Sequence, residues 1–90
     1  MTQDTELDQK FNETVDSFME AAVSKEKELS VPQVSSSFLY TSACYSARYF
    51  AIKSEKEKIS LEEFVREHVE FFESALRNGI EYYTTDDDDV

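Results

Sequence analysis

The chain has 90 residues, with 20 Asp or Glu against 9 Lys or Arg, and a formal net charge of −11. A single glycine and a single proline leave too little turn-forming sequence for an all-β fold, so the helical periodicity described below favours an all-α fold. The acidity argues against nucleic acid and anionic membranes as partners, because binding to phosphate rests on Lys and Arg. It leaves solubility, or a basic protein partner, as the explanation of the charge.

The length predicts a single domain over residues 1–90, with a small core that oligomerisation commonly supplements. Cys44 is the only cysteine, so an internal disulfide is excluded. The first ten residues lack the apolar core of a signal peptide, and the longest uncharged run is too rich in hydroxyl residues to span a membrane. Together these features predict a cytoplasmic location.

A first helix is expected over about residues 5–29. Its apolar residues fall within roughly 80° of arc on a helical wheel, and they are Leu7, Phe11, Val15, Phe18, Ala22 and Leu29. An apolar stripe this narrow can pack against only one neighbouring helix. The helix is expected to end near Leu29, because Pro32 disfavours helical backbone at Val31.

A second helix is expected over residues 31–54. Ser30 and Gln33 have the spacing of a capping box, with Pro32 in the first turn; Ser35 is a competing cap. The stretch 37–53 holds five of the twelve aromatic residues and one charge, Arg48, before Lys53. It is therefore the part of the chain around which the other helices are expected to pack.

This central helix has apolar residues on two separate arcs. The first arc contains Phe38, Tyr45, Tyr49 and Ile52, and the second contains Leu39, Tyr40, Ala43, Ala47, Phe50 and Ala51. A helix that is apolar on most sides is buried on more than one side. The pattern predicts a central helix sandwiched either between the two other helices or between one of them and a second subunit.

A third helix is expected over about residues 60–83, with Ser60 and Glu63 as its capping box. Its apolar face is about 180° wide on the helical wheel and contains Leu61, Phe64, Val65, His68, Val69, Phe72, Ala75 and Leu76. The face continues in register past Gly79, where a close contact is expected. Glu62–Arg66 and Glu73–Arg77 are expected helix-supporting pairs. Residues 84–90 are expected to form a disordered acidic tail.

Only two residues invite a catalytic or metal-binding interpretation. His68 is the only histidine and has no companion ligands at metal-site spacing, so no metal, cofactor or catalytic residue is predicted. It is expected to be a core or interface histidine, hydrogen-bonded to a tyrosine of the central helix. Cys44 is expected to be a small buried hydrophobic residue on the second arc, because no activating base is evident beside it.

Near the start of the central helix the chain resembles a known family. Ser37-Phe38-Leu39-Tyr40 is similar to a motif of small bacterial proteins, the domain-of-unknown-function family numbered 3144. That motif is followed in the family by Arg-Phe-Asn-Ala, where this chain has Cys44-Tyr45-Ser46-Ala47 and keeps an aromatic residue and the alanine. Leu76, Gly79, Ile80 and Tyr83 resemble the family's Leu-x-x-Asn-Leu-x-x-Tyr pattern. The resemblance spans most of residues 34–83 and implies a helical fold without implying an activity.

The sequence thus predicts a three-helix bundle in up-down-up order and identifies no reaction or ligand. The favoured function is that of a small interaction or structural protein that is not an enzyme and that forms a homodimer through its central helix. The expected interface residues are Phe38, Tyr45, Arg48, Tyr49 and Ile52. One alternative is a small-molecule-binding or enzymatic module around His68, Tyr40 and Tyr45. A further alternative is an acidic decoy that binds a basic protein surface.

Overall fold

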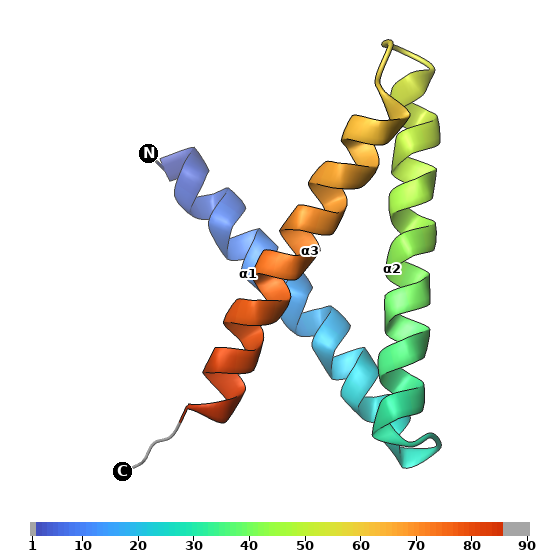
Figure 1. The fold of residues 1–90 in the computed structure, drawn as a ribbon. Coiled ribbons are helices and arrows are strands. Elements are labelled where there is room, and N and C mark those ends of the chain that lie inside the picture. The colour runs from blue at the N-terminus through green and yellow to red at the C-terminus, as the bar shows by residue number, and fades with distance from the viewer. Residues whose placement is uncertain (1, 86–90) are drawn as a thin grey trace. The chain divides into compact units, whose positions relative to one another are not determined.

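The computed structural model describes residues 2–85, and side chains from residue 5 onward. Within this range the chain forms three α-helices and one short 3-10 helix, with no β-strand (Figure 1). The all-α prediction with three helices is therefore confirmed. By its packing the chain divides into two units, Met1–Ala47 and Arg48–Val90. A single domain stays a prediction.

Helix α1 spans Thr2–Ser24 and is followed by the 3-10 helix η1 at Lys25–Lys27. The expected helix reached Leu29, so its last turn differs from the prediction. The carbonyl oxygen of Lys25 accepts hydrogen bonds from the backbone N–H groups of Glu28 at 2.9 Å and of Leu29 at 3.0 Å. This shared acceptor tightens the end of the helix into the 3-10 geometry common at helix termini.

Helix α2 spans Val31–Ser54, the range expected from the sequence, and Ser30 and Gln33 form the expected capping box. The Gln33 side-chain oxygen accepts from the Ser30 backbone N–H at 2.9 Å, and the Ser30 hydroxyl accepts from the Gln33 N–H at 3.3 Å. Two backbone donors that would lack helical partners are satisfied in this way. The first 17 residues of α2 belong to the first unit and its last seven to the second.

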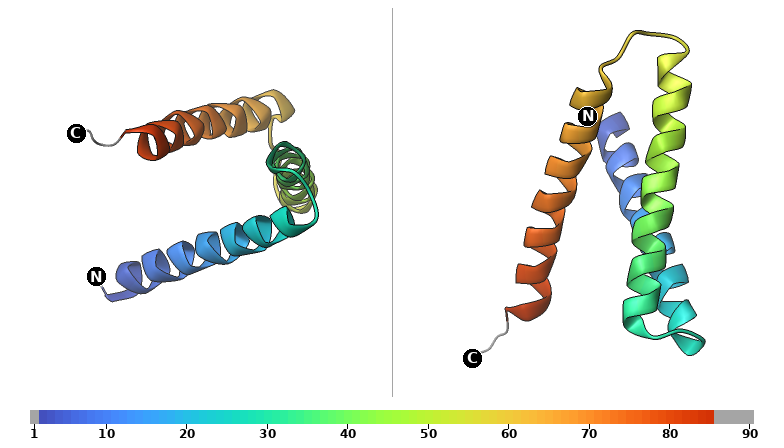
Figure 2. Two further views of the ribbon diagram at one scale, coloured as in Figure 1. Left: turned by 90° about the horizontal axis from the view of Figure 1, so that it is seen from below. Right: turned by 45° about the vertical axis from the view of Figure 1, so that its right-hand side comes forward.

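Helix α3 spans Leu61–Thr84 and follows a short connector after α2 (Figure 2). The Ser60 hydroxyl accepts from the Glu63 N–H at 3.1 Å, so Ser60 caps the helix as expected. The helix continues through Gly79, but a Cβ atom placed there meets nothing within 4 Å in the described structure. The expectation of a close contact at Gly79 is therefore wrong. Thr84 is the last residue of α3, so the expected tail was wrong at its first residue, and from residue 86 onward the tail lies outside the described residues.

One of the two expected ion pairs on α3 is wrong. Arg77 pairs with Glu73 at 2.9 Å, as expected, whereas Arg66 pairs with Glu70 at 3.9 Å and not with Glu62. Both partners of Arg66 lie four residues away, so helix geometry permits either. The side chains are exposed, and pairs of this kind contribute little to stability.

Few apolar side chains are shielded from solvent. Val34, in the first turn of α2, is 7% exposed and is the one buried residue among residues 5–85. Large apolar residues of all three helices remain exposed, including Phe18, Tyr40 and Phe72. None of the helices in residues 2–85 has the length and apolar character that crossing a bilayer requires.

Candidate functional site

An aromatic cluster forms where the end of α2 meets the start of α3 in the second unit. The ring of Phe64 lies between two rings of α2, with centroid distances of 5.5 Å to Tyr49 and 4.9 Å to Phe50. The second of these contacts is edge-to-face, one of the geometries that aromatic pairs prefer. The cluster thus holds the two helix ends together through side chains that lie within a few residues of the connector.

This pairing is missing from the sequence prediction. Tyr49 and Phe50 are consecutive, so they point about 100° apart and were assigned to different arcs of α2. Phe64 contacts both, and it therefore packs across the boundary between the two arcs. Two consecutive aromatic residues near the end of one helix, followed by an aromatic residue just after the next helix cap, are the sequence signal for such a cluster.

His68 extends the cluster by one turn of α3. It is half-buried, and its ring centroid lies 4.2 Å from that of Phe64 and 6.3 Å from that of Tyr49. Its Nδ1 atom is 2.9 Å from the carbonyl oxygen of Phe64. A carbonyl oxygen only accepts, so Nδ1 carries the proton and donates. The partner of Nδ1 is thus the backbone of its own helix. A hydrogen bond between Nε2 and a tyrosine of α2 stays a prediction.

The five expected interface residues all lie on α2. Phe38, Ile52 and Tyr49 are 39%, 43% and 47% exposed, and Tyr45 and Arg48 are also exposed. The four apolar ones follow one side of the helix, as the first arc requires. The structure contains no second copy of the chain, so an interface at these residues stays a prediction.

The second arc of α2 is exposed over most of its length. Tyr40 is 73% exposed, Leu39 is exposed, and only Phe50 near the helix end is half-buried. Cys44 is exposed as well, so the expectation of a buried cysteine is wrong. The reason is that Phe50, not the middle of this arc, is the part that contacts α3.

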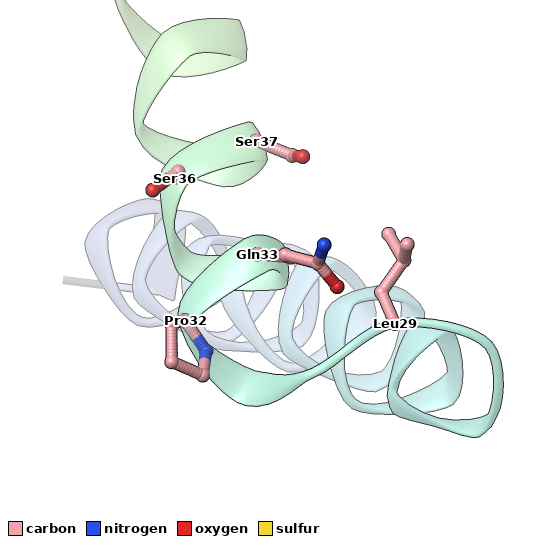
Figure 3. Close-up of a pocket in the computed structure, with 5 residues that line it drawn as sticks. All are labelled: Leu29, Pro32, Gln33, Ser36 and Ser37. Carbon is pink, nitrogen blue, oxygen red and sulfur yellow. The ribbon is translucent and has the colours of Figure 1, made fainter.

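A shallow hollow of about 460 Å³ lies where α1 ends and α2 begins, in the first unit. Its lining residues are Leu29, Pro32, Gln33, Ser36 and Ser37 (Figure 3). The side-chain oxygen of Gln33 is already used in the capping box with Ser30. The hollow therefore offers two serine hydroxyls, the Gln33 NH2 group and apolar surface, and none of its lining residues is charged.

The described residues contain no group of side chains placed to bind a metal ion. Among residues 5–85 no three His, Cys, Asp or Glu side chains are grouped so that they could hold an ion. The neighbours of His68 are aromatic rings and a carbonyl oxygen, and none of these activates an imidazole as a carboxylate would. The feature that the described residues define here is thus an aromatic surface.

Comparison with known families identifies one match. The sequence profile described as "Protein of unknown function (DUF3144)" matches residues 11–86. The chain belongs to this family. The expected resemblance to DUF3144 is confirmed, and the match extends the resemblance into α1 as far as Phe11. No curated protein and no solved structure matches the chain.

The DUF3144 match contains both candidate surfaces described above. It covers all of α2, with the first arc, and it covers the cluster of Tyr49, Phe50, Phe64 and His68. The family description assigns no activity, so the function remains unknown.

Proposed function

We propose that this chain is a small interaction protein that forms a homodimer through the first arc of α2. The observation that carries the proposal is the exposure of Tyr49 and Ile52, at 47% and 43%, with Phe38 and Tyr45 on the same side of the helix. Contiguous apolar patches of several hundred Å² are uncommon on soluble monomers and usually mark an interaction site. Tyr and Arg, both present here, are enriched at binding hot spots.

The charge distribution supports α2 as the place where two copies meet. Each chain carries −11, so two copies repel one another. Helix α2 has Arg48 and Lys53 and no Asp or Glu among its 24 residues. The repulsion is therefore reduced when α2 of one copy forms one side of the contact. A twofold axis is the commonest symmetry for such an association.

The proposal includes a bundle in up-down-up order with α2 sandwiched either between its two neighbours or between one of them and a second copy. The reversal from α2 to α3 is supported by the cluster of Tyr49, Phe50 and Phe64, since α3 must reverse direction after the connector for these rings to meet. The proposed setting is the bacterial cytoplasm, which suits a chain whose only cysteine is unpaired.

The dimer is tested by sedimentation velocity at micromolar concentration with a pair of matched variants. Tyr49→Glu places a carboxylate in the first arc, and the expected result is a change from dimer to monomer. Tyr40→Glu is the control, because Tyr40 lies nine residues away, or about 180° around the helix. It is exposed on the opposite side of α2, so this variant should remain dimeric.

Tyr49 also contacts Phe64, so its replacement could disturb the fold itself. Ile52→Glu provides the second variant, because Ile52 lies on the same arc outside the aromatic cluster. Helical content is checked by circular dichroism for each protein. A parent chain that sediments as a monomer, with Tyr45 and Tyr49 shielded from solvent quenchers, would overturn the proposal.

We also propose that the chain acts without enzymatic activity and without nucleic-acid or membrane partners. The imidazole Nδ1 of His68 is engaged by the Phe64 carbonyl, and the net charge opposes contact with phosphates. A basic protein partner is the alternative that the acidic α1 and α3 favour. It would be recognised by a complex whose affinity falls steeply with added salt.

A further inference from the structure

The start of α3 contacts α2 by one edge of its apolar face. Phe64 and His68 lie at this edge, against Tyr49 and Phe50. Phe72 and Leu76 lie eight and twelve residues after Phe64, which rotates them by about 80° and 120° around the helix. They point away from the end of α2 and are exposed, as are the other apolar residues of this side, Val65, Val69 and Ile80. The centre of the α3 face is therefore not used within this unit.

Helices α2 and α3 carry opposite net charges. Helix α3 carries six carboxylates and two arginines, a net charge of −4, whereas α2 carries two cations and no carboxylate. On α2, Arg48 and Lys53 are each four residues from an apolar residue of the arc, Ile52 and Tyr49 respectively. Arg48 thus borders the arc on the side away from Phe64, and Lys53 borders it on the side toward Phe50, which Phe64 contacts. On α3, Glu62 and Glu73 border the apolar face on the side of Val69 and Ile80.

These charges discriminate between the possible pairings of two copies. An α2–α2 contact brings like cations together, and an α3–α3 contact brings carboxylates together. A contact between α2 of one copy and α3 of the other joins opposite charges around two apolar surfaces, the arrangement that favours specific association. The pairs Lys53–Glu57 and Arg77–Glu73 are on the surface, where ion pairs contribute little to stability.

We infer that the first arc of α2, around Tyr49 and Ile52, is covered by the apolar face of α3 from a second copy, around Phe72 and Leu76. A twofold axis makes this contact occur twice, once in each direction, and so doubles the buried area. The inference rests on the proposed self-association and specifies which surfaces meet. It replaces a direct α2–α2 contact as the structure of the dimer.

The test is disulfide cross-linking between two differently sized versions of the full chain, in each of which Cys44→Ser removes the native thiol. One version carries Ile52→Cys and the other, lengthened by a tag, carries Leu76→Cys. The two are mixed in urea, refolded together under reducing conditions and then oxidised. The expected product is the mixed species, identified by its mass, because neither version alone has both thiols.

The control replaces Leu76→Cys with Ser74→Cys. Ser74 is exposed and lies about 200° around α3 from Leu76, on the carboxylate-rich side. The mixed product should be several-fold more abundant with Leu76→Cys than with Ser74→Cys. A second pair, Tyr49→Cys with Phe72→Cys, repeats the measurement in case either first variant fails to fold.

The outcomes distinguish the proposed homodimer from the more specific contact between α2 of one copy and α3 of the other. A dimer that yields mainly Ile52–Ile52 product overturns the α2–α3 contact and leaves the proposed dimer standing. A dimer that yields neither product, with both cysteine pairs, places the interface elsewhere and overturns both the inference and the proposed use of the first arc. A parent that sediments as a monomer overturns the proposed function together with the inference.

Discussion

Among the residues of the aromatic cluster, His68 has the most directly measurable state. Its Nδ1 atom donates to the Phe64 carbonyl at 2.9 Å, so the neutral ring should be the tautomer that carries hydrogen on Nδ1. Long-range nitrogen–proton NMR correlations of the imidazole distinguish the two tautomers. A ring protonated on Nε2 alone would contradict the hydrogen bond and the placement of His68 against Phe64.

Phe64 is the residue on which the cluster depends, because its ring contacts Tyr49, Phe50 and His68. It is half-buried, so Phe64→Ala should lower the free energy of unfolding by about 1–3 kcal/mol, less than for a fully buried phenylalanine. Phe71→Ala is the control on the same helix. That side chain is 71% exposed, and its loss should change the stability by no more than about 0.5 kcal/mol. Urea unfolding of both variants measures the difference, and equal losses would contradict the cluster.

At the residue scale the sequence predicts where side chains lie better than what they contact. The periodicity of α3 correctly places His68 beside Phe64, but a backbone carbonyl four residues earlier was overlooked as its hydrogen-bond partner. Arg66 could reach a carboxylate on either side, and local spacing does not choose between them. Cys44 was expected to be buried because its neighbours are apolar, yet burial depends on another element covering them.

At the element scale the predictions that succeed are those made by local interactions. The caps at Ser30 and Ser60 depend on residues three positions apart, and both are present. The continuation of α3 through Gly79 follows from the register of the apolar face on both sides. The end of α1 was placed too late, because the switch to 3-10 geometry at Lys25–Lys27 leaves no distinct pattern in the sequence.

Gly79 gives a prediction about α3 as an element. It has a helical environment and open space at the Cβ position, so Gly79→Ala should raise the free energy of unfolding by about 0.5–1 kcal/mol. Ala75→Gly, one turn earlier, should lower it by a similar amount. Both are measured by urea unfolding at a concentration low enough to keep the chain monomeric. A loss of stability in Gly79→Ala would mean that another helix of the same chain approaches the backbone there.

At the scale of the whole molecule, sequence patterns do not determine which surfaces meet. Helix α2 has two arcs of comparable apolar character, and its periodicity gives no preference between them. Phe64 packs across their boundary, an arrangement that neither arc predicts alone. Packing between helices depends on side chains far apart in sequence, so the periodicity of one helix does not determine its partner. In the inferred dimer, the opposite charges of α2 and α3 provide that preference.

Self-association also predicts how the stability of the whole molecule depends on protein concentration. If the folded chain pairs and the unfolded chain does not, mass action stabilises the dimer as concentration rises. A hundredfold increase adds about 1.4 kcal/mol per chain, which for a domain of this size raises the Tm by roughly 5–10 °C. Thermal unfolding followed by circular dichroism from low to high micromolar concentration measures the shift, with Ile52→Glu as the variant whose Tm should stay constant. A parent whose Tm is independent of concentration over this range would show that its exposed aromatic surface is not covered by a second copy.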